Sequence, residues 1–232
     1  MLVAGAVADK PARLVDAAEP LNLAGPPPRF VSRGGDKLDA ALDGFGIPVA
    51  HRTALDAGAS TGGFTDCLLQ RGAAHVIAVD VGRGQLDARL RADPRVTVRE
   101  RTNIRDVEVA DPVDLVVADL AFVSLRTVAP TLRRLAAADI VALIKPQFEA
   151  GRAEASRGKG VIRDPDVWRA VIVDVRAAFA EAGAAMMGLM VSPLRGAEGN
   201  VEFLALFRPG AAPAVPPPAV DVDAVVRQAV VA

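Results

Sequence analysis

The stretch "LDAGASTGGFTD", residues 55–66, decides the fold of this chain. It completes a short apolar run and then places glycines at positions 58, 62 and 63, directly before an amphipathic segment. Glycine lets the backbone turn tightly and approach another group closely. Backbone N–H groups at the start of the following helix can then bind polar or anionic groups. The stretch therefore predicts a strand, a ligand-holding turn and a helix.

Outward from this stretch, apolar β-branched runs alternate with helical patterns, which indicates a parallel sheet buried on both faces. The loop before the final run is too short for a parallel crossover, so the last strand should be antiparallel. We predict an α/β fold of the class I (Rossmann-like) methyltransferase type, with a seven-stranded, mostly parallel sheet and helices on both faces. The predicted strands cover residues 53–58, 75–81, 96–101, 114–120, 140–146, 184–194 and 201–207, and the helices between them cover residues 62–72, 85–91, 128–138 and 165–182.

Length and composition narrow the class of protein. The chain has 232 residues, a formal net charge of −1 and one cysteine. This length suits one sizeable domain with a small appendage. The single cysteine excludes a disulfide framework, so we predict a cytoplasmic protein with Cys67 in its core. The sequence has neither a membrane-spanning apolar run nor a secretory signal, and its near-neutral charge requires any nucleic-acid surface to be local.

Three regions are predicted along the chain. Residues 1–28 contain short apolar pieces, a turn at residues 9–11 and three closing prolines, so we expect one or two strands and a stiff linker. Residues 29–208 form the α/β domain. Residues 209–232 are rich in proline, alanine and valine and are expected to be a loosely attached end.

Polar residues at the carboxyl ends of the strands are the first candidates for a site, because doubly wound folds bind ligands there. Asp80 ends the second strand, where its carboxylate can accept hydrogen bonds from both hydroxyls of a ribose. With the glycine turn, it fits a nucleoside-bearing cofactor such as NAD or S-adenosylmethionine. The spacing GxxxGG and the acidic Asp56 before it favour S-adenosylmethionine. Asn103, after the third strand, lies near the adenine on this interpretation, or is an ordinary turn asparagine.

Four charged residues are predicted to meet at the same edge of the sheet. Asp119 and Lys145 end the fourth and fifth strands. Glu202 opens the last strand and lies at this edge because that strand is antiparallel. Lys37 belongs to an early helix that ends before Gly46 and can fold over the edge. Charged residues on neighbouring strand ends favour a common site over separate solvated termini.

These residues match a family. From about Phe30 to Phe207 the chain resembles the TlyA ribosomal RNA 2′-O-methyltransferases, historically also labelled hemolysins, whose catalytic domain is related to the FtsJ/RrmJ methyltransferases. The matching segments are "VSRGGDKL", "LDAGASTGGFTD", "AHVIAVDVGRGQL", "DPRVTVRERTN", "DLVVADLAFVSL", "LIKPQFEAG" and "GNVEFLALF".

The resemblance implies a catalytic tetrad of Lys37, Asp119, Lys145 and Glu202, and S-adenosylmethionine as cofactor. A ribose 2′-hydroxyl is a weak nucleophile that loses its proton as the methyl arrives. Lys145 can orient that oxygen, stabilise its developing charge and, when neutral, accept the proton, while alignment with the activated methyl contributes most. No metal is required. The residues expected to hold the cofactor are Asp56, Gly58, Ala59, Ser60, Thr61, Gly62, Gly63, Phe64, Asp80, Asn103 and Asp119.

The resemblance also implies a partner: cytidine riboses in ribosomal RNA of the small and large subunits. No membrane partner is expected, and a monomer is favoured. Family members carry an N-terminal S4 domain, a small RNA-binding module. The first 28 residues are similar to only its last third, so the S4 domain is expected to be truncated, or the start codon is set too far downstream.

Two groups of basic residues are expected to contact RNA. One group precedes the sheet, and the other lies in the loop "GRAEASRGKGVIRD", residues 151–164, whose glycines suit a lid. The alternative for this loop is an ordinary solvated surface. The expected RNA-binding residues are Arg29, Arg33, Arg152, Arg157, Lys159 and Arg163.

Three other functions stay open on the sequence. The chain could be a non-catalytic RNA-binding or ribosome-assembly factor that keeps the fold. It could be a membrane-lytic hemolysin, although its apolar runs read as sheet strands. It could also be an NAD-dependent oxidoreductase, which binding of NAD against S-adenosylmethionine would separate.

Overall fold

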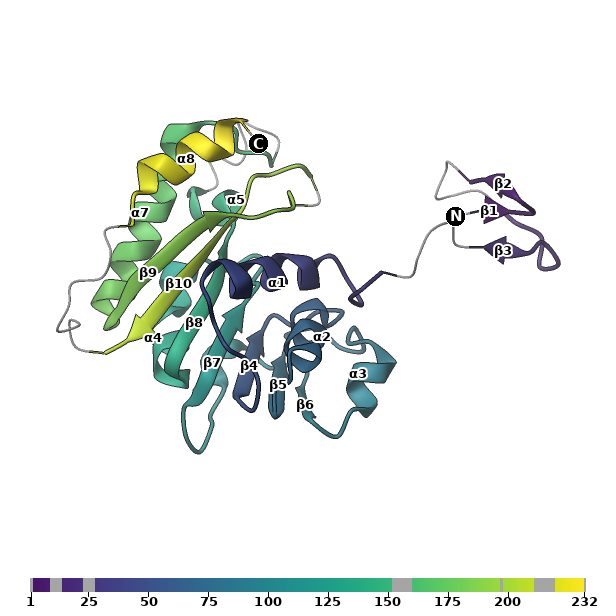
Figure 1. Ribbon diagram of the computed structural model, residues 1–232, viewed down its shortest axis with the longest axis horizontal. Helices are drawn as coiled ribbons and strands as arrows, with labels where there is room; N and C mark the ends of the chain where they lie inside the picture. The colour runs from purple at the N-terminus through teal and green to yellow at the C-terminus, as the bar shows by residue number, and fades with distance from the viewer. Residues whose placement is uncertain are drawn as a thin grey trace.

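The computed structural model describes residues 2–8, 14–22, 28–151, 160–196, 198–210 and 220–231 (Figure 1). Within these residues the main sheet has seven strands in the order β6-β5-β4-β7-β8-β10-β9. Six strands run in the same direction and β10 runs in the opposite one, so it pairs antiparallel with β8 and β9 while the other pairs are parallel. The predicted α/β fold class is therefore confirmed. The strands are β4 (Thr53–Ala57), β5 (His75–Val79), β6 (Val96–Arg99), β7 (Val113–Ala118), β8 (Ala136–Ile144), β9 (Ala184–Val191) and β10 (Phe203–Pro209).

Helices cover both faces of this sheet, as predicted (Figure 1). They are α1 (Gly34–Gly44), α2 (Gly63–Gln70), α3 (Ala88–Ala92), the 3-10 helix η1 (Ile104–Asp106), α4 (Leu125–Leu135), α5 (Pro146–Glu149), α7 (Pro165–Glu181) and α8 (Val222–Val231). On one face, α1 to α3 pack through a core cluster that contains Leu68 and Leu115. On the other face, α4, α7 and α8 pack through a second cluster that contains Leu132 and Phe207. Alternate residues of each central strand thus enter opposite clusters.

The strand register brings the ends of the central strands together. Ala57 of β4 pairs with Ala118 of β7, so the residues that follow them, Gly58 and Asp119, leave the sheet side by side. Phe203 of β10 pairs with Ile144 of β8, so residues 202 and 145 lie at this same edge. The chain order reverses between β4 and β7, which is where doubly wound folds place their ligands.

One predicted helix was misplaced. Residues 128–138 were expected to be helical, but α4 begins and ends three residues earlier, at Leu125 and Leu135. The Ser124 side chain accepts a hydrogen bond from the Arg126 backbone N–H and so caps the helix at an earlier residue. The backbone is already extended at Ala136, where β8 begins.

The N-terminal prediction of one or two strands was too low. The described residues there form a separate antiparallel sheet of three short strands, β1 (Leu2–Val3), β2 (Ala6–Val7) and β3 (Leu21–Asn22), in the order β2-β1-β3. Ala4 and Gly5, at φ +48° and +82°, make the tight turn between the first two strands. The predicted turn at residues 9–11 lies outside the described residues.

The prediction of a loosely attached C-terminal end was wrong for residues 220–231. Most of them form α8 (Val222–Val231), whose Val222, Val226 and Ala229 are buried in the cluster shared with α7. Asp223 also accepts a hydrogen bond from Arg169 of α7 at 2.5 Å. None of the helices in the described residues combines the length and the apolar composition needed to span a lipid bilayer.

Candidate active site and cofactor cleft

The turn after β4 depends on Gly58. This residue has φ +87°, and its N–H donates to the Val79 carbonyl at 2.9 Å. A Cβ atom at this position would lie 2.4 Å from the backbone oxygen of Asp119. Only glycine therefore lets the ends of β4 and β7 approach so closely.

The later glycines of the stretch serve packing. A Cβ on Gly62 would lie 2.3 Å from Leu90 Cδ1, and a Cβ on Gly63 would lie 2.2 Å from Ser32 Oγ. Two cavities open at this edge of the sheet, and Gly62 lines neither of them. Its predicted contact with a cofactor therefore has no support in the geometry, and its role is to seat α2.

The larger of the two cavities, of about 590 Å³, opens at the carboxyl ends of β4, β5 and β7. Five of the predicted cofactor residues line it: Gly58, Ser60, Asp80, Asn103 and Asp119. The sequence interpretation missed the rest of the lining, although the rule that ligands bind beyond strand ends points to the residues after Asp80 and Asp119. The missed lining residues are Val79, Val81, Gly82, Gln85, Thr102, Ile104, Arg105, Leu120, Ala121, Phe122 and Val123.

Asp80 joins the second strand to the glycine turn. Its Oδ2 accepts the Ser60 N–H at 2.8 Å, and its Oδ1 accepts the Gly82 N–H at 2.6 Å. Each carboxylate oxygen can accept a further hydrogen bond, so Asp80 can still receive ligand hydroxyls. Asn103 lines the same cavity while its side chain caps η1 by accepting the Arg105 N–H, so it is also an ordinary turn asparagine.

The smaller cavity, of about 300 Å³, is lined by all four residues of the predicted tetrad: Lys37, Asp119, Lys145 and Glu202. It shares Gly58, Ser60 and Asp119 with the larger cavity. The two cavities therefore meet at the end of β7. Its other lining residues are Ser32, Arg33, Gly34, Ala59, Thr61, Gly63, Phe64 and Gly196.

The tetrad is two ion pairs. The Lys145 ammonium pairs with the Asp119 carboxylate, and Lys37 Nζ lies 2.5 Å from Glu202 Oε2. Lys37 is 8% exposed and Glu202 is 3% exposed. Two cations and two anions make the group formally neutral. A neutral cluster of this kind can bind a polar group without a net charge being buried.

Four predicted cofactor residues, Ala59, Thr61, Gly63 and Phe64, line the smaller cavity and not the larger one. Asp56 lines neither, because it is fully buried. Its Oδ2 accepts the Thr65 hydroxyl at 2.7 Å. Burial raises the pKa of Asp56 to about 7, against the opposing effect of this hydrogen bond. Asp56 therefore supports α2 from beneath the turn.

The predicted RNA-binding residues have different environments. Arg33 is exposed and lines the smaller cavity, and Arg163 is exposed. Arg29 instead pairs with Asp39 of α1 and lies over the Phe30 ring, 4.6 Å from its centroid. Its guanidinium is thus already occupied within the protein. Arg152, Arg157 and Lys159 lie outside the described residues.

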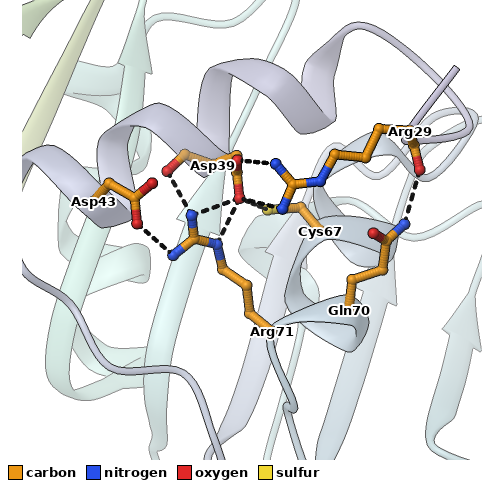
Figure 2. Close-up of polar contacts among 6 residues, drawn as sticks. All are labelled: Arg29, Asp39, Asp43, Cys67, Gln70 and Arg71. Carbon is orange, nitrogen blue, oxygen red and sulfur yellow. Dashed lines mark hydrogen bonds and ion pairs between the residues drawn. The ribbon is translucent and has the colours of Figure 1, made fainter.

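Figure 2 shows the network in which Arg29 takes part. Arg71, at the end of α2, donates from Nε to Asp39 Oδ1 at 2.6 Å and from Nη1 to Asp43 Oδ1 at 2.8 Å. These bonds hold α1, which carries Lys37, against α2. Cys67 lies beneath them, buried as predicted, and burial is the main cause that raises its pKa to about 12.

No cluster of three or more His, Cys, Asp or Glu side chains suited to a metal occurs within the described ranges.

The sheet order, the glycine turn and the cleft beyond it define the protein as a class I methyltransferase. The chain belongs to the FtsJ-like methyltransferase family, whose model matches residues 30–208. It is 50% identical over 210 residues to the 16S/23S rRNA (cytidine-2′-O)-methyltransferase TlyA of Mycobacterium tuberculosis, an alignment that covers 88% of this chain and 78% of that protein.

Solved structures agree with this assignment. The crystal structure of a Lactococcus lactis protein, to which a hemolysin name has been given, has a TM-score of 0.81 at 40% identity and covers 86% of this chain and 98% of that one. Magnesium protoporphyrin IX methyltransferase from Synechocystis, solved with bound SAH, has a TM-score of 0.56 at 13% identity and covers 76% of this chain and 82% of that one. The second likeness concerns the fold alone.

Proposed function

We propose that this protein transfers a methyl group from S-adenosylmethionine to the 2′-hydroxyl of a cytidine ribose in ribosomal RNA. One observation carries the proposal: a nucleoside-sized cavity and a cavity lined by two lysines and two carboxylates meet at Asp119. The acceptor class follows the M. tuberculosis relative, which is a 16S/23S rRNA (cytidine-2′-O)-methyltransferase.

The larger cavity fits the cofactor. Its volume of about 590 Å³ lies within the range of about 300–1,000 Å³ that is usual for small-molecule sites. Asp80 retains acceptor capacity for the two ribose hydroxyls, and Ile104 and Leu120 offer apolar surface for a base. S-adenosylmethionine supplies an activated methyl group on a sulfonium. Gly58 and Asp119, which line both cavities, would direct that methyl toward the smaller one.

The smaller cavity fits the acceptor hydroxyl. Lys145 would donate a hydrogen bond to the 2′-oxygen and stabilise the negative charge that develops there, or accept its proton when neutral. Asp119 orients the Lys145 ammonium through their ion pair. Glu202 holds Lys37 in the same cavity through the second ion pair. Fixed alignment of these groups provides most of the rate enhancement.

Replacing Lys145 by alanine is expected to lower methyl transfer by about a thousandfold, the middle of the range for a lost acid–base group. The test measures labelled methyl transferred from S-adenosylmethionine to intact 30S and 50S subunits, followed by nuclease digestion to locate the label on a ribose. Cofactor affinity, measured by calorimetry, should change little because Lys145 does not line the larger cavity.

Three outcomes would contradict the proposal. Ribose methylation by Lys145→Ala at the wild-type rate would exclude the assigned chemistry. A wild-type chain that binds S-adenosylmethionine but methylates neither subunit would favour an assembly factor. Binding of NAD in preference to S-adenosylmethionine would point to the oxidoreductase.

We further propose that unpaired arginines at this edge contact RNA phosphates. Among the described residues, half of the arginines pair with a carboxylate, but the exposed Arg33, Arg83, Arg101 and Arg105 do not. Arg33 and Arg105 line the two cavities, and the other two flank the loops that close the larger one. Arginines without a carboxylate partner are available to a polyanion.

The double variant Arg83→Ala/Arg101→Ala is expected to bind ribosomal subunits about tenfold more weakly at low salt. Its plot of log affinity against log salt concentration should lose roughly 1.5 units of slope, because each lost phosphate contact removes about 0.7–0.9. Filter binding over a salt series measures both quantities. Arg176→Ala, on an exposed arginine of α7 that lines neither cavity, is the control. Equal losses of affinity and of salt dependence in Arg176→Ala and in the double variant would refute the assignment.

A further inference from the structure

Two segments that flank the site, residues 119–125 and residues 145–149, contact each other at three points. At the start of both segments, Lys145 pairs with Asp119. In the middle, the Phe148 and Phe122 rings lie 5.3 Å apart, tilted by 52°. At the far end, Glu149 accepts hydrogen bonds from residues 124 and 125. The short segment 145–149 thus holds the segment 119–125 along its whole length.

Glu149 makes the contact at the far end, and the proposed chemistry does not use it. It is 5% exposed at the end of α5. Its Oε2 accepts the Ser124 hydroxyl at 2.5 Å, and its Oε1 accepts the Leu125 N–H at 2.7 Å. Arg126 Nε lies 3.5 Å from Oε2. A carboxylate at the first turn of α4 is also favoured by the helix dipole. Glu149 therefore caps a helix that is distant from it in sequence.

The segment that Glu149 holds forms a wall of both cavities. Asp119 lines both, and Leu120 to Val123 line the larger one. Phe122 within it has φ +64° and is 92% exposed. A non-glycine residue keeps such a conformation only where its surroundings impose it. Leu120 and Val123 pack against the core, but Phe122 between them is exposed, so the shape of the wall depends also on the polar contacts at its two ends.

We propose that Glu149 is a positioning residue for methyl transfer, acting through residues 119–125. It fixes the wall of the cofactor cavity and, through the same segment, the Asp119 carboxylate that orients Lys145. The inference rests on the proposed function for its kinetic consequences. Its contact with Leu125 and its effect on the cofactor cavity do not depend on which acceptor is methylated.

Glu149→Ala is expected to weaken S-adenosylmethionine binding about tenfold and to lower kcat about thirtyfold, while KM for the ribosomal subunit stays within about twofold. KM is preserved because the exposed arginines are untouched. Glu149→Gln should recover much of the loss, since its amide oxygen can still accept the Leu125 N–H. A merely structural contact would lower the melting temperature without separating kcat from KM.

Asp174→Asn is the matched control. Asp174 lies at the outer side of the same network, where Arg126 donates to it at 3.3 Å, but its side chain is 59% exposed. Its loss should leave cofactor affinity and kcat unchanged. If Asp174→Asn reproduces the losses of Glu149→Ala, Arg126 and not Glu149 sets the geometry.

Hydrogen–deuterium exchange gives a readout independent of activity. Peptides that contain Leu125 should exchange at least tenfold faster in Glu149→Ala, with intermediate exchange in Ser124→Ala, which removes one of the bonds. Unchanged exchange, cofactor affinity and kcat in both variants would overturn the inference. A wild-type chain that binds the cofactor but methylates no RNA would refute the proposed function instead, and exchange and affinity would still test Glu149. If Glu149→Ala fails to fold, Glu149→Gln and Ser124→Ala decide by the same measurements.

Discussion

Replacing Gly58 by alanine is expected to slow methyl transfer by about a hundredfold. The added Cβ would lie 2.4 Å from the Asp119 carbonyl oxygen, which is far inside van der Waals contact. The end of β7 must then shift, and the Asp119 carboxylate moves relative to Lys145. A displacement of about 1 Å in a catalytic group can cost about a hundredfold in rate. Cofactor affinity should fall too, because Gly58 lines both cavities. Steady-state methyl transfer and calorimetry measure the two effects.

Gly46→Ala separates this collision from backbone strain. Gly46 also has a positive φ, +63°, but nothing lies within 4 Å of an added Cβ. Its replacement should lower the free energy of unfolding by about 1 kcal/mol and leave transfer unchanged. Equal kinetic losses in Gly58→Ala and Gly46→Ala would mean that strain alone is responsible. A Gly58→Ala protein with wild-type rates would contradict the proposed role of the turn.

Removing one partner of the Lys37–Glu202 pair is expected to destabilise the fold more than removing both charges. Lys37 and Glu202 are both buried, at 8% and 3% exposure, so a single replacement leaves a charge without its partner. Such a loss typically costs about 3–5 kcal/mol. Lys37→Met and Glu202→Gln should each show it, and the double variant should lose less than their sum. All three should lose methyl transfer, since both residues line the acceptor cavity.

Chemical denaturation of the four proteins measures this coupling as a double-mutant cycle. Arg227→Ala provides the contrast, because the Arg227–Asp221 pair is 4.0 Å apart and its side chains are 70% and 65% exposed. Exposed pairs contribute little to stability, so no measurable change is expected. Strictly additive losses in the Lys37 and Glu202 variants would show that the buried pair is not coupled.

The grouping of the four charged residues at one edge of the sheet was predictable because three of them sit at strand ends. In a doubly wound sheet, the end of each parallel strand and the start of an antiparallel one share an edge. Asp119, Lys145 and Glu202 could therefore be grouped without knowledge of any side-chain contact. Lys37 depended on the family resemblance, since a lysine on an amphipathic helix is usually solvated.

Contacts between distant segments could not be predicted in this way. The pairing of Arg29 with Asp39 depends on how α1 lies on α2, so the sequence did not reveal that Arg29 has a carboxylate partner. α8 docks on apolar surface that α7 and β9 present to it. The local composition of residues 220–231 does not reveal that surface. The glycine motif did not reveal that its glycines have different roles. Gly58 allows the close approach of Asp119, and Gly62 allows the packing of α2.

The position of β10 has a consequence for the order of folding. β9 has β10 as its one hydrogen-bonded neighbour in the described sheet, and β10 joins it to β8. During synthesis, β9 therefore emerges before the strand that pairs with it, and the sheet can be completed only after residues 203–209 are available to pair with both β8 and β9. Pairings between segments distant in sequence form slowly. Glu202 arrives with this final strand, so the nascent protein acquires a complete site only as its sheet is completed.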